Sequence, residues 1–293
     1  MANIIETLNL TKYYGKHLGI KDLNLVVSKG EIFGYIGPNG AGKSTTIRLL
    51  LGLIFKSSGT ARVFGKDVEK HKEDILSDIG YMQAESNFYS DMRVGELIRY
   101  SARLRKRNCD QEARTLMDRF ELDRSKKISE LSLGNRKKVS IVCAMQHKPR
   151  LYILDEPTSG LDPLMQKEFW DLVKERNCEG ATFLISSHVL SEVQHNCGRA
   201  AIIRNGSIVR TANVAELIGG MAKKIVAAGI QGELSLDGMR NVEVNGDVLS
   251  FLYRGDINML LAELAKTKIR DLQISEPDLE EVFLHYYERD ESL

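Results

Sequence analysis

The sequence lacks several features that would place it in a protein class at once. Its four cysteines, at positions 109, 143, 178 and 197, form no Cys-X-X-Cys pair, which argues against structural zinc and a disulfide scaffold. The apolar run Leu49 to Phe55 is far shorter than the roughly 18 residues that a membrane-spanning helix needs. Met1 to Asn9 have no cationic segment followed by an apolar run, so no secretory signal is visible. We therefore expect a cytoplasmic protein that does not itself cross a bilayer.

An excess of charge of one sign is also absent. The 41 Lys and Arg residues nearly balance 40 Asp and Glu residues, so the formal net charge is +1, and 43% of the residues are hydrophobic. This composition is typical of a folded globular protein. A near-neutral surface has no overall field that attracts nucleic acid, and we expect no nucleic-acid partner.

The organisation of the chain predicts two α/β domains. A length of 293 residues allows about two domains, and the sequence changes character near residue 215. Residues 1–215 alternate apolar strands with helices, the pattern of a mainly parallel sheet, and residues 84–147 carry helical spacing alone, which predicts a helical insertion. The predicted buried strands are Ile32 to Ile36, Leu151 to Leu154 and Thr182 to Ile185.

The remaining residues, 216–293, predict a small α/β domain. Val242 to Val244 and Val248 to Tyr253 flank an Asn-Gly-Asp turn that suits a hairpin. Asp256 is expected to open a helix, followed by a strand over 269–274 and a last helix over 279–287.

A glycine-rich segment between a strand and a helix predicts a phosphate-binding loop. It fits the pattern G-x-x-x-x-G-K-[ST] and comprises Gly37, Pro38, Asn39, Gly40, Ala41, Gly42, Lys43 and Ser44, with Thr45 opening the helical run. Glycines let backbone N–H groups turn towards a phosphate, and the helix N-terminus adds partial positive charge. Lys43 is expected to reach the β- and γ-phosphates of ATP, and Ser44 to ligate Mg²⁺. The alternative is an ordinary glycine-rich turn.

Two carboxylates end the apolar strand that begins at Leu151. Asp155 could hold Mg²⁺, and Glu156 could accept a proton from the water that attacks the γ-phosphate. Adjacent residues of a strand point to opposite faces, but the end of a strand can turn both towards one site. The alternative is a solvated acidic loop.

With these two motifs in place, residues 4–215 resemble the nucleotide-binding subunit of an ATP-binding cassette (ABC) transporter. Five further stretches occur in the order that this family has. Tyr14 resembles the aromatic residue that stacks on adenine, Gln83 the glutamine that joins metal and water to the helical insertion, and His188 the switch histidine at the γ-phosphate. Residues 131–135 stand where the signature LSGGQ is expected, and Asp162 lies in a loop similar to the one that crosses between subunits.

The signature segment departs from the family pattern. Leu133 replaces its first glycine and Asn135 its glutamine, whereas Ser132 and Gly134 are retained. A helix is expected to start here and end near His147, before Pro149. The next three residues are basic, and they could either help beside a triphosphate or form a solvated face: Arg136, Lys137 and Lys138.

The resemblance implies an ATPase that powers transport. Two subunits, expected to be a homodimer, would enclose ATP between the phosphate loop of one chain and Ser132, Gly134 and Asp162 of the other. An integral membrane permease would be the second partner and would hold the chain at the cytoplasmic face of the membrane. The layout is most similar to the ATPases of ABC-2 type drug and antibiotic exporters. Four apolar residues could line the groove for the permease, or could pack within the insertion: Phe88, Tyr89, Met92 and Val94.

Two alternatives keep the fold but change the function. One is a soluble ABC ATPase that transports nothing, and the other is a nucleotide-dependent regulator that hydrolyses ATP poorly because of Leu133.

Overall fold

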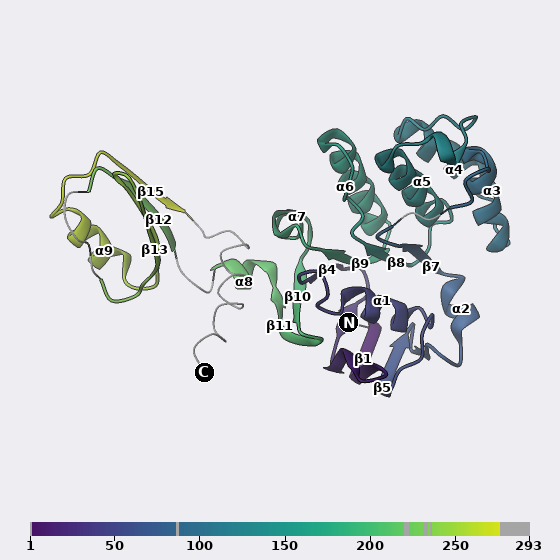
Figure 1. The fold of residues 1–293 in the computed structure, drawn as a ribbon, viewed down its shortest axis with the longest axis horizontal. Helices are drawn as coiled ribbons and strands as arrows, with labels where there is room; N and C mark the ends of the chain where they lie inside the picture. Colours follow the sequence, from purple (N-terminus) through teal and green to yellow (C-terminus); the bar gives the residue numbers. More distant parts are fainter. Residues whose placement is uncertain (1, 86–87, 220–222, 231–233, 235, 276–293) are drawn as a thin grey trace. The chain divides into compact units, whose positions relative to one another are not determined.

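The structure is a computed structural model that describes residues 2–85, 88–219, 223–230, 234 and 236–275 (Figure 1). The chain divides into two compact units, residues 1–211 and residues 212–293. Among the described residues, no helix has the length and apolar character needed to cross a membrane.

A six-stranded sheet forms the centre of the first unit. The strand order is β11-β10-β4-β9-β8-β7, and neighbouring strands from β10 to β7 run parallel. The strands are β4 (Ile32–Ile36), β7 (Ile79–Met82), β8 (Leu151–Asp155), β9 (Thr182–Ser187), β10 (Arg199–Arg204) and β11 (Ser207–Asn213). Because parallel strands end at one edge of a sheet, the residues that follow β4, β8 and β9 come together there.

Helices cover this sheet on both faces (Figure 1), and the strands alternate accordingly. Tyr152 and Leu154 of β8 pack into one apolar cluster with residues of α5 (Leu133–Met145) and α6 (Pro163–Cys178). Leu151 and Ile153 point the other way, into a second cluster with residues of α1 (Lys43–Leu50). A strand buried on both faces reads as a continuous apolar run, which is why the sequence showed this strand clearly.

The second cluster also joins the parallel sheet to an antiparallel one. The antiparallel sheet contains β1 (Asn3–Tyr14), β2 (His17–Leu23), β3 (Val26–Ser28), β5 (Ser58–Val63) and β6 (Lys66–Asp67). The first unit also contains two short helices, α2 (Lys72–Leu76) and α7 (Leu190–Asn196). The turn between β1 and β2 brings Tyr14 near the start of α1, because Gly19 of β2 lies against both Tyr14 and Thr45.

The described part of residues 84–147, for which the sequence predicts a helical insertion, is mainly helical. It contains α3 (Val94–Leu104), α4 (Asp110–Arg119), the 3₁₀ turn η1 (Ile128–Glu130) and α5. Phe120 is fully buried where these helices meet, and α5 packs against both α3 and β7. Helix α5 therefore connects the insertion to the central sheet.

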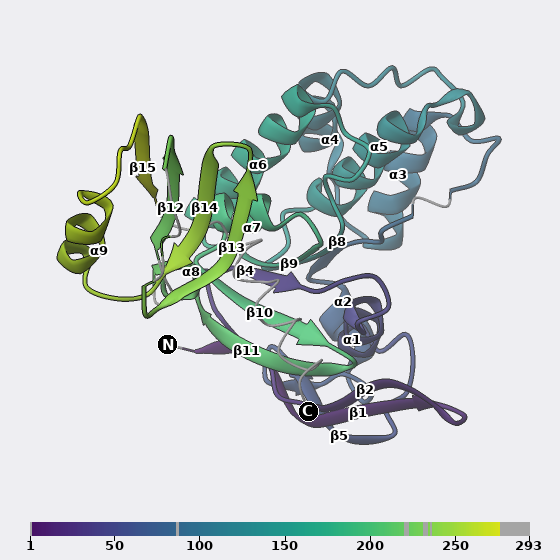
Figure 2. The same ribbon diagram turned by 60° about the vertical axis from the view of Figure 1, so that its left-hand side comes forward.

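Among its described residues, the second unit contains a four-stranded antiparallel sheet with α9 packed against it (Figure 2). Its order is β13-β14-β12-β15, and the chain enters it through α8 (Val214–Gly219). Leu260 and Leu264 of the helix pack on Phe251 and Tyr253 of the sheet. The elements are β12 (Lys223–Ala228), β13 (Met239–Asn245), β14 (Val248–Tyr253), α9 (Ile257–Leu264) and β15 (Asp271–Ser275).

The predicted elements of this unit agree with the structure where it is described. The hairpin forms between β13 and β14, and the Asp256 side chain caps α9 by accepting from the Asn258 N–H. The strand expected over 269–274 is β15. The last predicted helix, 279–287, lies outside the described residues.

Candidate functional site

The glycine-rich loop connects β4 to α1 at the carboxyl edge of the sheet. Gly42, the N-cap of α1, has a φ of 110°, which only glycine adopts readily. A Cβ on it would also lie 2.8 Å from Ile20 and 2.9 Å from the Gly19 carbonyl oxygen. The loop can thus turn tightly over β2, and the N–H groups of the first turn of α1 remain available to an anion.

Lys43 extends from the start of α1 back over this loop. Its side chain is only 6% exposed, and its ammonium donates to the carbonyl oxygens of Gly37 and, at 3.3 Å, of Pro38. The same ammonium lies 3.4 Å from Glu156 Oε1. A lysine held in this way is a positive charge at a defined point, which suits the recognition of a phosphate.

Asp155, the last residue of β8, is buried and hydrogen-bonded on both carboxylate oxygens. Ser44 Oγ donates to its Oδ2 at 2.8 Å, and Ser186 Oγ of β9 donates to its Oδ1. A hydroxyl and a carboxylate fixed side by side are the oxygen ligands that Mg²⁺ accepts, together with water and phosphate.

Glu156 turns towards the same site because its backbone leaves the strand. Its φ is +49°, a left-handed conformation that is unfavourable for a residue with a side chain. Its N–H donates to the carbonyl oxygen of Ser186 at 3.1 Å, and its Oε2 lies 2.6 Å from His188 Nδ1. The turn at the strand end that the sequence required is therefore present, and strain of this kind is often found at active sites.

These residues border one cavity of about 320 Å³. The ring of Tyr14 lies over Gly19 at its rim, where a Cβ would come within 2.9 Å of the ring. The cavity is lined by Tyr14, Leu18, Gly19, Pro38, Asn39, Gly40, Gly42, Lys43, Ser44, Thr45, Ala84, Asp155 and Glu156. Gly37 and Ala41 belong to the same loop but do not line it, and His188 adjoins it through Glu156.

The remaining candidate residues lie away from this lining. Gln83 directly follows β7 and is exposed, and its neighbour Ala84 lines the cavity. Ser132 is the N-cap of α5, where its Oγ accepts from the Asn135 N–H at 3.3 Å. Asp162 is the N-cap of α6 and accepts from the Met165 N–H at 3.0 Å.

The signature segment and the loop before Asp162 are in contact with each other. A Cβ on Gly134 would lie 2.8 Å from the Gly160 carbonyl oxygen, so the close approach requires glycine at 134. Leu133 borders Gly160 as well, and its side chain is 61% exposed. The departure from the family pattern thus places an apolar side chain at the surface beside both segments.

The structure decides between the alternatives for two groups of side chains. Lys137 and Lys138 are buried, so the alternative of a solvated basic face does not hold for these two residues. Val94 is fully buried, and Phe88 and Met92 pack against the apolar cluster, as the packing alternative predicts. Tyr89 is exposed and meets Tyr100 of α3 edge to face.

Sequence reasoning missed several residues around the cavity. Leu18 and Gly19 line it although neither belongs to a motif, and only their place after the Tyr14 turn could have indicated them. Glu192 of α7 accepts from Thr158 Oγ1 at 2.7 Å. Burial raises the pKa of its carboxyl group, and the nearby charge of Glu156 adds to the effect.

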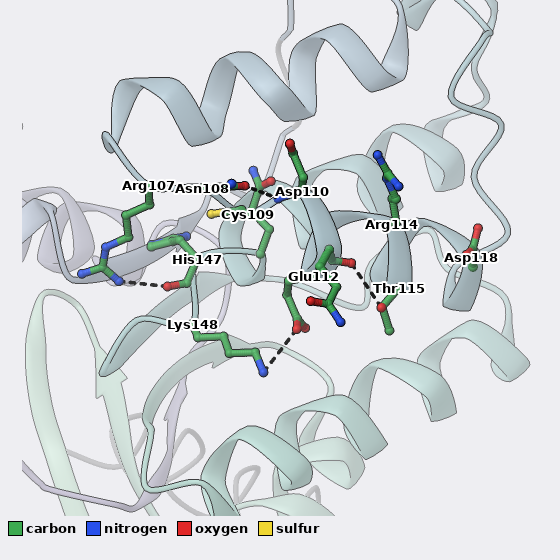
Figure 3. A pocket seen from close by; sticks show the side chains of 12 residues that line it. Arg107, Asn108, Cys109, Asp110, Glu112, Arg114, Thr115, Asp118, His147 and Lys148 are labelled. Atoms are coloured by element: carbon green, nitrogen blue, oxygen red, sulfur yellow. Dashed lines mark hydrogen bonds and ion pairs between the residues drawn. The ribbon is translucent and has the colours of Figure 1, made fainter.

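A larger cavity, about 890 Å³, lies between the start of α4 and the end of α5 (Figure 3). None of the residues that the sequence suggests for binding nucleotide or metal lines it. Among its lining residues, Lys148 pairs with Glu112 at 3.2 Å. No glycine-rich loop lines this cavity, whereas one borders the smaller cavity. The smaller cavity is therefore the better candidate despite its lesser volume.

Comparison with known proteins shows which family the chain resembles. Residues 20–159 match the family model described as ABC transporter. The chain is 38% identical over 216 residues to the bacitracin transport ATP-binding protein BcrA of Bacillus licheniformis, covering 71% of this chain and 69% of that protein. It is 31% identical to the linearmycin resistance ATP-binding protein LnrL of Bacillus subtilis, covering 96% of this chain and 97% of the relative.

A solved structure shows the same fold. It is described as the ATP-binding subunit of an ABC transporter, with a TM-score of 0.70 and 29% sequence identity. The match covers 73% of this chain and 91% of that structure.

Proposed function

The chain belongs to the ABC transporter family as an ATP-binding subunit, and from this premise we propose that it hydrolyses ATP to drive the export of a drug or antibiotic. The observation that carries the proposal is the convergence of Lys43, Ser44, Asp155 and Glu156 on one cavity. We propose residues 1–215 as the ATPase domain, and the compact unit formed by residues 1–211 supports this.

The cavity and its rim provide groups that suit the phosphates and the base of ATP. The loop from Gly37 to Ser44 and the N-terminus of α1 provide N–H groups and positive charge for the phosphates, with Lys43 at the β- and γ-positions. Tyr14 presents an aromatic ring at the rim, and it is suited to stack on the adenine base. Thr45 also lines the cavity and would contact the phosphates together with the loop.

Mg²⁺ fits the oxygen ligands at this site. Ser44 and Asp155 would hold it, with Gln83 as a third ligand through the segment that follows β7. When bound, the ion neutralises charge on the β- and γ-phosphates. The contribution of the chain is the geometry, because Ser186 fixes the Asp155 carboxylate and α1 fixes Ser44.

Hydrolysis needs a base beside the γ-phosphate and a fixed charge to stabilise the transferring group. Glu156 would accept the proton of the attacking water, with His188 within hydrogen-bonding distance of its carboxylate. Lys43 would stabilise the negative charge on the phosphoryl oxygens, and Gln83 would orient the water. All four groups act by position, since phosphoryl transfer leaves little covalent chemistry for the protein.

We further propose that the working unit contains two copies of this chain and a membrane permease. Ser132, Gly134 and Asp162 do not line the cavity of their own chain, which is consistent with contact to ATP held by the partner. Tyr89 and Tyr100 are exposed on the insertion and offer apolar surface to a permease at the cytoplasmic face of the membrane. The printed names of the relatives, bacitracin transport and linearmycin resistance, support an exporter over a soluble ATPase that transports nothing.

The direct test measures phosphate release by the purified chain with ATP and Mg²⁺. We expect turnover in the wild type and its loss, by about 100-fold or more, in Lys43→Ala. Lys16→Ala, a change in the exposed turn between β1 and β2, is the matched control. If Lys43→Ala kept wild-type turnover, Lys43 would not be needed for phosphate binding.

The permease is tested by a second experiment, which asks whether the chain co-purifies with the product of a neighbouring gene that encodes about six membrane helices.

A further inference from the structure

Lys137 is a buried lysine in the second turn of α5 whose charge the proposed mechanism does not use. Its side chain is 2% exposed. Its ammonium donates to the carbonyl oxygen of Ala84 at 2.7 Å. Ala84 lines the nucleotide cavity and directly follows Gln83.

A lysine at this position is costly unless its surroundings compensate. Burial lowers the pKa of the Lys137 ammonium, and the negative charges of Glu156 and Asp155 oppose that shift. The ammonium is thus close enough to the acids of the site to feel their charge. A lone buried charge would destabilise the fold, so the carbonyl of Ala84 and the two acids are what hold Lys137 in place.

Helix α5 links this contact to the signature segment. Ser132 caps its N-terminus, and Lys137 lies five residues further along the same helix. Val139, Ile141 and Val142 are fully buried in an apolar cluster that contains residues of both the insertion and the central sheet, so α5 is held firmly between them. In addition to this packing, Lys137 gives the first half of α5 a polar contact to the segment that follows β7.

We propose that Lys137 is a positioning residue that ties the signature helix to the segment carrying Gln83, so that contact of Ser132 with the partner's nucleotide sets Gln83 in the chain's own site. The inference rests on the proposed function. Lys137 touches no substrate and acts through the Ala84 carbonyl. Its removal should weaken catalysis and the closure of the dimer but leave the first binding of ATP nearly intact, because the loop from Gly37 to Ser44 is unchanged.

The experiment compares Lys137→Met, which removes the donor and the charge, with Lys137→Gln, which retains an N–H donor. Lys148→Met is the control, since Lys148 follows the same helix but pairs with Glu112 away from the nucleotide cavity. Phosphate release gives kcat and KM, and a fluorescent ATP analogue gives Kd. In the Glu156→Gln background, ATP-dependent dimerisation is followed by light scattering.

We expect kcat of Lys137→Met to fall about 10- to 100-fold, as for a misplaced catalytic group, with Kd for the analogue within about threefold of wild type. Dimerisation should weaken, Lys137→Gln should recover part of both losses, and the control should behave as wild type. The idea is overturned if kcat and dimerisation stay within about twofold of wild type, or if Kd rises as much as kcat falls.

Two further comparisons deal with a variant that does not fold and with a failure of the proposed function. If Lys137→Met does not fold, Lys137→Gln is compared with Lys137→Ser, whose hydroxyl is too short to reach the carbonyl, and equal kcat values overturn the inference. Wild-type turnover that is lost in Lys43→Ala, together with an unaffected Lys137→Met, rejects this inference alone. Absence of turnover in the wild type rejects the proposed function itself.

Discussion

Glu156 is a charged residue with an unfavourable backbone conformation, and it lies in the proposed site. Its left-handed backbone turns the carboxylate out of the strand and between Lys43 and His188. Ser186 supports this turn by accepting the Glu156 N–H at its backbone carbonyl. The fold thus accepts an unfavourable conformation at the residue whose direction matters most for the proposed reaction.

Replacing Glu156 by Gln should separate binding from hydrolysis. The amide keeps the size of the side chain but cannot accept the proton, so we expect turnover to fall by about 100- to 10,000-fold. ATP affinity should stay close to wild type, because the loop and Lys43 are unchanged. Phosphate release and analogue binding measure the two, with Glu73→Gln on the exposed face of α2 as the control. Turnover at the wild-type rate would show that Glu156 is not the base.

His147 lies at the other end of α5 and affects stability rather than catalysis. Its ring Nε2 lies 3.2 Å from the Ile79 carbonyl oxygen, which makes Nε2 the protonated nitrogen of the neutral ring. Burial lowers its pKa from 6.5 to about 4, and the positive charge of Arg105 adds to the effect. Folded protein therefore keeps this ring neutral at pH values where an unfolded chain would protonate it.

This difference predicts how stability depends on pH. The unfolded chain gains a proton below pH 6.5 and the folded chain only near pH 4, so the free energy of unfolding should fall as the pH is lowered through that window. The slope from this one group is at most about 1.4 kcal/mol per pH unit. Urea unfolding followed by Trp170, the single tryptophan, measures it. His147→Gln should have a shallower slope, and an identical slope would contradict the assignment.

At the scale of elements, the starts of α5 and α6 each have two roles. Ser132 and Asp162 cap these helices within their own chain, and both are also proposed to meet nucleotide or the partner across the dimer. Capping fixes the direction of each helix start, so the residue offered to the partner is held by the same contact that stabilises the helix.

The cap of α6 can be tested apart from its role in the dimer. Asp162→Ala removes the acceptor for the Met165 N–H and should lower the free energy of unfolding by about 1 kcal/mol. Asp162→Asn retains an oxygen acceptor and should be close to wild type in stability. Urea unfolding followed by Trp170, which lies on α6, reports both. Equal losses in the two variants would mean that the charge of Asp162, rather than its capping bond, stabilises the helix.

At the scale of the whole molecule, the proposed site is split between two surfaces of one chain. The cavity with Lys43 and Glu156 belongs to the central sheet, whereas Ser132 and Gly134 start a helix of the insertion and do not line it. Gly134 instead packs against Gly160 beside Asp162. A second copy that brings these segments to the cavity would complete the hydrogen bonds around ATP.

Nucleotide should therefore control the oligomeric state. With ATP and Mg²⁺, Glu156→Gln should elute as a dimer in size-exclusion chromatography with light scattering, because ATP persists and joins the two surfaces. The double variant Lys43→Ala/Glu156→Gln should remain a monomer under the same conditions. A mass that does not respond to ATP in Glu156→Gln would argue against the ATP-dependent homodimer.

Local patterns made much of the architecture predictable. The strand from Ile32 to Ile36 has the predicted bounds, and the Asn-Gly-Asp turn lies between β13 and β14 as expected. Pro149 follows the end of α5, as its lack of an N–H requires. Each of these features depends on residues close together in the sequence, where backbone preference and apolar spacing act directly.

The burial of Lys137 and Lys138 shows the limit of such reasoning. From the sequence, three consecutive basic residues after a helix start could form a solvated face or lie beside a triphosphate, and the structure buries two of them. Their partners lie far along the chain, as Ala84 does for Lys137. Sequence periodicity indicates which face of a helix is apolar, but it cannot show which distant carbonyl or carboxylate makes a buried charge tolerable.

The sequence by itself determined the glycine-rich loop between a strand and a helix, the strand that ends in two acids and the helical segment after β7, because contiguous residues carry each of them. Only the tertiary structure decided that Ser44 bonds to Asp155 across 111 residues and that Lys43 meets Glu156. The reason is the strand order: β9 separates β4 from β8, and parallel pairing brings the ends of all three to one edge of the sheet. That pairing is a property of the folded chain and of no single segment.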